Sequence, residues 1–401
     1  MNRILNISNC YMLLVVLLLL QDVIYPGGTL LSLGIVGLFA LCSAVIALYT
    51  CIRYKLPAYF KGLNWLLILF TLYGILYIVS DPKDVVWANG SVDVKSYSYL
   101  LNIYLSLLPI YVFYYFTLIG QFYKQKIRFW AIVLMAVSAL KFYSFYLTSI
   151  DSPFDEITNS YGYLFVGLIA LLIFFEDKFI LQFALLVICT VFITISMKRG
   201  AVVTAGFSLI PFVLYQWKRD NKIQRIALTI LIVSFVIGIV YMVFYMLHTS
   251  DYFISRIEST LEGNSSERDE LFIRFWQYYT EEAHFGEQLV GGGANQTLRI
   301  GPNFAHNDWL EILINQGLLG CLFYIIYWWL FWREQKKCAR IAELSQARWG
   351  LIICFVASGM MTFYSMSYAN LPIGIAMTIG ICLGQITHYQ YQQKTTPLND
   401  D

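Results

Sequence analysis

The side chains best suited to chemistry lie together in one short stretch, where a polar segment leads into an apolar one. His306 is followed by Asn307, Asp308 and Glu311, and the residues after them are mostly hydrophobic. A histidine just before a helix start lies beside the positive end of that helix, which favours the neutral imidazole. Because a neutral imidazole accepts a proton from a hydroxyl group, His306 is a candidate general base.

The acids in this stretch also have a structural interpretation. Asp308 and Glu311 have the spacing of a capping box, in which side chains at a helix start bond to free backbone N–H groups. We therefore expect a helix to begin at Asp308, with its carboxylate used at least in part as the N-cap.

A second candidate is a pair of basic residues. Lys198 and Arg199 are the only charged residues between Phe179 and Trp217. This stretch is too long for one membrane-crossing helix and fits two, so the pair is expected at a tight hairpin. A charge beside hydrocarbon is unfavourable unless it is paired or faces water, which predicts an anion-binding role. An ordinary hairpin tip with side chains reaching to the interface is the alternative.

A third candidate is the set of arginines in residues 248–307, a long polar stretch between apolar segments. Its basic residues other than histidine are Arg256, Arg268, Arg274 and Arg299, with no lysine. Arginine binds phosphate or carboxylate through two parallel hydrogen bonds, whereas lysine acts as a point charge. The pattern predicts recognition of a specific anion. The alternative is that each arginine pairs with a nearby acid.

The composition indicates the class of protein that carries these side chains. The chain is 59% hydrophobic and 13% charged, whereas soluble domains carry about 25% charged residues. We therefore predict an all-α polytopic membrane protein, with residues 1–401 forming a single membrane domain. The net charge of +2 indicates no particular partner, and no nucleic acid is expected.

The apolar segments are numerous and long. A membrane-crossing helix needs about 20 mostly apolar residues, and about twelve segments qualify. The segments are 8–25, 29–51, 62–80, 97–119, 128–149, 160–176, 179–196, 200–217, 226–247, 308–332, 350–367 and 371–388.

The distribution of lysine and arginine predicts the orientation. Basic residues are concentrated in alternate connecting segments if the N-terminus is inside, and such segments are cytoplasmic as a rule. Both termini are then cytoplasmic, and residues 248–307 form a large loop on the outer side. Its apolar stretch 271–279 predicts a folded amphipathic helix, which would lie on the membrane surface.

Several motifs in the second half of the chain occur in a recognisable order. The motifs are Ser196–Ala201, Ser265–Phe272, the glycines Gly291–Gly293, and His306–Glu311 followed by Gly317 and Gly320. Taken alone, Gly291–Gly293 is interpreted as a flexible connector.

Together these motifs resemble those of the O-antigen ligase and O-antigen polymerase superfamily. The resemblance covers roughly residues 190–330, and the first half of the chain agrees only in hydropathy. It implies the fold of membrane-embedded glycosyltransferases that use lipid-linked sugars. It also implies glycosyl transfer on the outer face of the bacterial inner membrane, between sugars carried on undecaprenyl diphosphate.

The resemblance also implies roles for individual residues. His306, Arg199 and Arg268 are expected to be catalytic, with the arginines stabilising the charge that develops on the leaving diphosphate. Arg274 fits the pattern as well, and Glu267 occupies a position where the family often has glycine, so the second essential arginine stays open between Arg268 and Arg274. Lys198, Arg274, Asn307, Asp308 and Glu311 are expected to bind substrate.

The expected partners follow from this reaction. They are an undecaprenyl-diphosphate-linked oligosaccharide and the lipid bilayer, and a chain-length regulator is a further candidate. No cofactor and no metal are expected, because no metal-ligand spacing occurs in the outer segments.

Three functions remain as alternatives. The favoured one is a polymerase that joins repeat units into O-antigen, capsule or exopolysaccharide, because the acidic form of the His306–Glu311 motif looks more like polysaccharide polymerases. The second is a ligase that transfers finished glycan to lipid A-core. The third is a transporter or flippase, which would place ionisable residues near the bilayer midplane, where only Lys141 is conspicuous.

Overall fold

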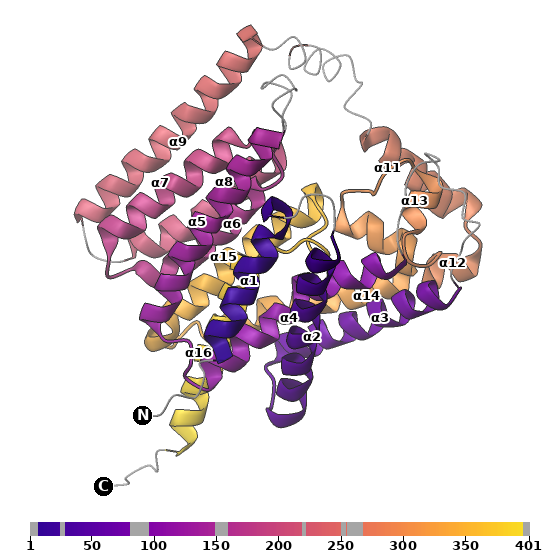
Figure 1. Cartoon of the computed structure of the whole chain (residues 1–401), viewed down its shortest axis with the longest axis horizontal. Helices are drawn as coiled ribbons and strands as arrows, with labels where there is room; N and C mark the ends of the chain where they lie inside the picture. The colour runs from indigo at the N-terminus through magenta and orange to yellow at the C-terminus, as the bar shows by residue number, and fades with distance from the viewer. Residues whose placement is uncertain are drawn as a thin grey trace.

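The computed structural model describes residues 7–24, 29–80, 96–148, 159–218, 222–249, 254 and 268–395. Within these residues every regular element is helical (Figure 1). In lipid every backbone N–H and C=O must find a partner inside its own segment, and helices meet that requirement. The predicted all-α fold class is confirmed.

The long helices coincide with the predicted apolar segments, one helix for each. A short 3-10 turn, Leu172–Phe175, extends α6. The helices are α1 (Ile7–Ile24), α2 (Leu30–Arg53), α3 (Ala58–Ser80), α4 (Ser96–Leu118), α5 (Lys124–Thr148), α6 (Gly162–Leu171), α7 (Phe179–Ile195), α8 (Arg199–Trp217), α9 (Lys222–Thr249), α14 (Asp308–Lys337), α15 (Ser345–Tyr364) and α16 (Ile373–Thr395).

Among the described residues, 7 helices are long and apolar enough to cross a membrane. Three shorter apolar helices, at Ile7–Gln21, Gly162–Phe175 and Phe179–Ile195, accompany them. The largest boundary difference is α16, which continues to Thr395 although the apolar segment was expected to end at 388. Its last turns are polar, so hydropathy alone cannot place the helix end.

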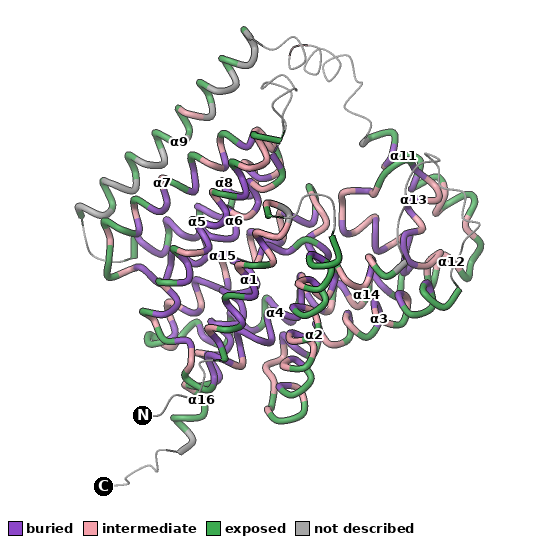
Figure 2. Tube along the Cα trace, viewed as in Figure 1, coloured by how far each residue is buried: buried purple, intermediate pink, exposed green. Residues whose placement is uncertain are grey.

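The centre of the bundle is formed by α4 and α16, which are largely buried in Figure 2. Glycines let these helices approach closely. A Cβ atom at Gly380 would lie 2.5 Å from the Ile110 carbonyl oxygen, and one at Gly384 would lie 2.7 Å from Thr117 Cβ. Small residues at such crossings are typical of helix packing in membranes.

The periphery of the bundle is apolar as well. Leu48 is 63% exposed, Leu76 66%, Leu140 57% and Val240 62%, on α2, α3, α5 and α9 respectively. Exposed apolar faces of this extent are unfavourable in water and are expected where helices contact lipid. This pattern supports a membrane protein.

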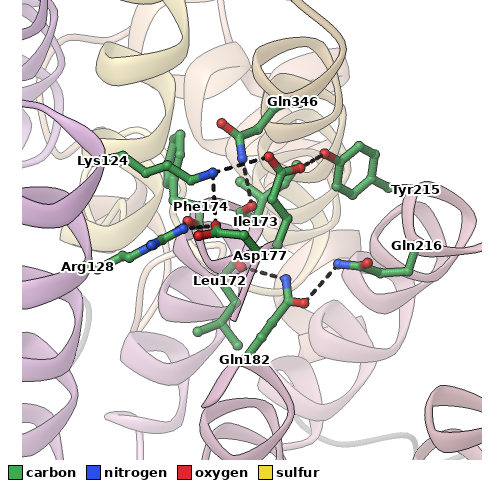
Figure 3. A network of polar contacts seen from close by, with 11 residues as sticks. Lys124, Arg128, Leu172, Ile173, Phe174, Asp177, Gln182, Tyr215, Gln216 and Gln346 are labelled. Carbon is green, nitrogen blue, oxygen red and sulfur yellow. Dashed lines mark hydrogen bonds and ion pairs between the residues drawn. The ribbon is translucent and has the colours of Figure 1, made fainter. Parts of the chain in front are cut away.

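The two ends of the bundle differ in chemistry. At one end, Lys124 Nζ lies 2.9 Å from Asp177 and 3.3 Å from Glu176, while Arg128 also pairs with Asp177 and Tyr215 donates to Glu176 (Figure 3). This network joins α5 and α8 to the segment after α6. The sequence predicts that this end faces the cytoplasm.

Residues 268–305, called the loop module here, pack at the other end, over α3 and α14. The module contains α11 (Arg268–Gln277), a π-helical turn (Tyr278–Glu282), α12 (Phe285–Val290) and α13 (Gln296–Ile300). It lies at the right of Figure 1. Of the rest of the expected loop, the structure describes residues 248, 249, 254, 306 and 307.

The hydrophobic stretch predicted to form an amphipathic helix is helical, as α11. Its apolar face packs inward: Leu271 and Phe275 are buried against Ala305 and Ile314. The helix is therefore held by the protein itself, and a position on the membrane surface stays a prediction.

Candidate functional site

His306 lies directly before α14 in a left-handed conformation, with φ 50°. The next residue, Asn307, is the N-cap, and its side-chain oxygen accepts a hydrogen bond from the Leu310 backbone N–H at 3.1 Å. A residue other than glycine held in this conformation costs on the order of 1–3 kcal/mol. The surrounding contacts must therefore fix the turn that presents the imidazole.

The predicted N-cap at Asp308 is wrong, because its carboxylate points into the protein. The side chain is 0% exposed. It accepts hydrogen bonds from the Tyr324 hydroxyl at 2.5 Å and from the Ser367 backbone N–H at 2.8 Å. Asp308 thus joins the start of α14 to the segment after α15, and Asn307 caps the helix in its place.

The predicted capping box is wrong as well. Glu311 is 0% exposed and accepts hydrogen bonds from Thr297 Oγ1 at 2.6 Å, Ala305 N at 2.9 Å and Asn315 Nδ2 at 3.0 Å. None of these donors is the backbone N–H of the N-cap. The carboxylate instead ties the loop module to α14.

These two acids hold the His306 turn from both sides. Glu311 fixes the backbone N–H of Ala305, directly before the histidine, while Asp308 fixes the first helical turn after it. Both carboxylates are used by protein donors, so their geometry supports a positioning role. Their predicted contact with substrate stays a prediction.

The loop module is docked on a break in α14. Gly317 has φ 65° and ψ −163°, so the helix is interrupted there. The carbonyl oxygens of Ile314 and Asn315 accept hydrogen bonds from the backbone N–H groups of Gly292 and Gly293, each at 3.0 Å. The break frees carbonyl groups that would otherwise bond within the helix, and the glycine triplet satisfies them.

Only glycine fits on both sides of this contact. A Cβ atom at Gly317 would lie 2.5 Å from Gly291 N and 2.6 Å from the Leu289 carbonyl carbon, and one at Gly291 would collide with Asn315. Gly291 and Gly317 also have positive φ angles, which favour glycine. The segment interpreted as a flexible connector is therefore a hydrogen-bonded joint.

The α7–α8 junction is the tight hairpin expected from the sequence. Ser196 O accepts a hydrogen bond from Asn159 N at 2.8 Å, and Met197 has φ 52°. Lys198 is the residue before α8 and is partly buried, while Arg199 begins the helix and is exposed. Within the described part of the chain Arg199 forms no ion pair, so its guanidinium is available to an anion.

The structure brings the α8 and α14 starts to the same end of α15. A Cβ atom at Gly200, next to Arg199, would lie 3.0 Å from Tyr364 Cβ. Trp309 Nε1 donates a hydrogen bond to Thr362 Oγ1 at 3.1 Å. Thr362 and Tyr364 are both in the last turn of α15, so Arg199 and the His306 turn flank that helix end.

The two loop arginines differ in what the structure describes. Arg274, on α11, forms an ion pair with Glu282, and both side chains are 46% exposed. Arg268 is the first residue of α11, and its side chain lies outside the described residues, as does Arg256. The choice between Arg268 and Arg274 stays open.

Several positioning residues could not be found from the sequence. Thr297, Asn315 and Tyr324 bond to the two buried carboxylates, yet each is an unremarkable residue in an apolar or polar stretch. Their partners lie up to 16 residues away along the chain, so only the folded arrangement identifies them.

The described residues contain no group of three or more His, Cys, Asp or Glu side chains placed to hold a metal ion. His306 can exchange a proton, and Arg199 can stabilise an anion.

A comparison with known families covers the part of the chain that contains these residues. A family model described as O-antigen ligase matches residues 184–325. The match begins within α7 and ends within α14, so it contains the α7–α8 hairpin, the loop module and the His306 turn. It supports the predicted relationship to the O-antigen ligase and polymerase superfamily. No curated protein matches the chain.

Proposed function

We propose that this protein is a polymerase that joins lipid-diphosphate-linked oligosaccharide repeat units into a polysaccharide. The family match supports the broader activity, that of a glycosyltransferase of the O-antigen ligase or polymerase type acting on lipid-linked glycan in a membrane. The observation that carries the proposal is that this matched region places Arg199, which has no ion-pair partner among the described residues, and a strained His306 beside one end of α15.

The proposed reaction is a single displacement. His306 removes the proton from an acceptor sugar hydroxyl, and the hydroxyl oxygen attacks the first carbon of the donor glycan. A new glycosidic bond forms as the bond between that carbon and the phosphate oxygen breaks. The electron pair leaves with the lipid diphosphate, and the proton rests on the imidazole.

The arginines act on the departing group. Negative charge on the diphosphate grows as its bond to the sugar breaks, and a fixed cation close to that position lowers the barrier. Arg199 is the first such cation, and Arg268 or Arg274 is the second. Lys198 adds positive charge next to Arg199, and Asn307 lies next to His306, where it would face the acceptor.

The location of the reaction is part of the proposal. We place the His306 end of the bundle on the outer face of a bacterial inner membrane, with both termini in the cytoplasm. Support comes from the excess of basic residues in the connecting segments at the other end, where Lys124 and Arg128 lie. The donor carrier would be undecaprenyl diphosphate, and a chain-length regulator would be a partner.

A ligase is the second candidate, because the matching family model carries the description O-antigen ligase. The two reactions use the same donor and the same departing group and differ in the acceptor. A polymerase transfers to another lipid-linked repeat unit, whereas a ligase transfers to lipid A-core.

The test is deletion of the gene in its host, followed by gel analysis of the glycans and complementation. A polymerase mutant should carry single repeat units on lipid A-core, and the wild-type gene should restore long chains. Complementation with His306→Ala or Arg199→Ala, at normal membrane levels, should fail. Long glycan accumulating on the lipid carrier would instead identify a ligase, and repeats trapped on the inner leaflet would identify a flippase.

A further inference from the structure

Arg299 is a loop-module residue whose surroundings differ from those of the other cations. It lies in α13, where its guanidinium carbon is 6.0 Å from the centre of the Tyr77 ring at the end of α3. Its Nη1 donates a hydrogen bond to Gln296 Oε1 at 3.3 Å. Both contacts are with neutral groups, so the positive charge is not compensated by them.

Two other cations have acidic partners. Arg274 pairs with Glu282 in the same module, and Lys337 pairs with Glu334 at 2.7 Å at the far end of α14. Within the described residues Arg299 has no carboxylate partner. A partly buried guanidinium without a counter-ion is unfavourable unless a bound anion neutralises its charge.

One nitrogen of Arg299, Nε, shows where such an anion would bind. This Nε is buried, and no acceptor in the described part of the chain lies within hydrogen-bonding distance of it. Nearly all buried polar groups in proteins are bonded, so an exception calls for a partner. A guanidinium bonds to an oxyanion through Nε and one Nη nitrogen, side by side, and this is the geometry that phosphate and carboxylate groups favour.

The position of Arg299 is fixed by the network that also fixes the His306 turn. Thr297, two residues before it, donates to Glu311, which in turn holds Ala305. Gln296 donates to the Tyr278 hydroxyl at 3.0 Å. The arginine is thus held in place before any ligand arrives, which favours tight binding.

We propose that Arg299 is an additional substrate-binding residue, which binds an oxyanion of the lipid-linked glycan on the α3 side of the His306 turn. The oxyanion is a diphosphate of a lipid carrier or a carboxylate of an acidic sugar. The inference rests on the proposed function for the identity of the ligand. Arg274 pairs with Glu282, whereas Arg299 has no carboxylate partner among the residues that the structure describes.

The alternative is that Arg299 only anchors α13 on the Tyr77 ring. Arg333 provides a matched control, because its guanidinium carbon lies 5.6 Å from the centre of the Trp329 ring at the opposite end of α14. Arg333→Gln removes an arginine from an aromatic ring face without touching the loop module.

The test uses the full-length protein, purified in detergent, with farnesyl diphosphate and glucuronate as separate probes. Arg299→Gln should weaken binding of one probe by about tenfold or more, the loss expected for a charged hydrogen bond. Arg333→Gln should leave binding of both probes unchanged. The probe that loses affinity identifies the diphosphate or the carboxylate as the ligand.

Arg299→Lys keeps a cation over Tyr77 and guards against misfolding of the glutamine variant. It should still weaken binding several-fold, because lysine cannot form the paired hydrogen bonds. The proposal is overturned if Arg299→Lys and any folded Arg299→Gln bind both probes as tightly as the unmodified protein. Because binding needs no glycosyl transfer, failure of the His306 test would leave this result interpretable.

Discussion

Among single residues, the proposed reaction depends most on how His306 is held. The residue has a positive φ angle. Before it, the buried Glu311 carboxylate holds the backbone N–H of Ala305, and after it the buried Asp308 carboxylate bonds to the backbone of Ser367. The position of His306 before an apolar run makes it a candidate from the sequence, but the sequence predicts the wrong residue as the N-cap. Asn307, Asp308 and Glu311 can all cap a helix, and only the buried partners Tyr324 and Thr297 decide which of them does.

Replacing His306 with glycine should separate stability from activity. Glycine adopts a positive φ angle without strain, so His306→Gly is expected to leave the melting temperature unchanged or slightly raised. Loss of the imidazole should reduce glycosyl transfer by about 10²-fold or more. Thermal unfolding and polymer synthesis measured on the same preparation check both parts, and full activity would rule out a general base at this position.

Replacing Glu311 with glutamine should loosen the turn. The amide NH₂ cannot accept a hydrogen bond. Depending on which carboxylate oxygen it replaces, either Ala305 N or both Thr297 Oγ1 and Asn315 Nδ2 would lose their acceptor. Leaving such a donor unsatisfied costs about 1–3 kcal/mol. We expect Glu311→Gln to lower both the unfolding temperature and the activity. An unchanged unfolding temperature would show that this carboxylate does not stabilise the contact between the loop module and α14.

Among the elements, the apolar helices can be predicted from the sequence, but the joint between the loop module and α14 cannot. Long apolar runs identify helices because lipid accepts little else, so each expected segment is a helix. The break at Gly317 has no comparable sign, since Gly320, three residues later, lies inside a regular helix. What distinguishes Gly317 is the approach of the loop module, a contact between segments far apart in sequence.

Gly317→Ala should undock the loop module. The added methyl group would enter the backbone of Leu289 and Gly291 at a positive φ angle, which destabilises by more than about 1 kcal/mol. We expect faster proteolysis within residues 268–305 and reduced polymer synthesis. Gly37→Ala in α2 is the control, because nothing lies within 4 Å of its Cβ position. Equal protease resistance in the two variants would show that docking of the loop module does not depend on Gly317.

At the scale of the whole molecule, the described helices place the His306 turn and Arg199 at one end of the bundle and the Lys124–Asp177 network at the other. The basic residues predicted which end is cytoplasmic, but the arrangement of helices around α4 and α16 could not be predicted. It depends on close contacts such as those of Gly380, and isolated glycines occur in many spans without such a role.

The orientation can be checked with alkaline phosphatase fusions. The enzyme needs disulfide bonds and is active only in an oxidising compartment. A fusion after Phe285 in the loop module should be active, and one after Lys336 should be inactive. The reverse pattern would place the candidate site in the cytoplasm and remove its access to an outer-face substrate.

We propose that His306 and Arg199 serve one glycosyl-transfer site. The test uses vesicles that contain only the purified full-length protein and an undecaprenyl-diphosphate-linked repeat unit. The measurement is the release of undecaprenyl diphosphate together with the length of the glycan. The unmodified protein should release carrier and form chains, while His306→Ala and Arg199→Ala, present at the same amount, should both lose at least about 10²-fold of the rate. Chain formation at an undiminished rate by either variant would show that the replaced residue is not part of the site.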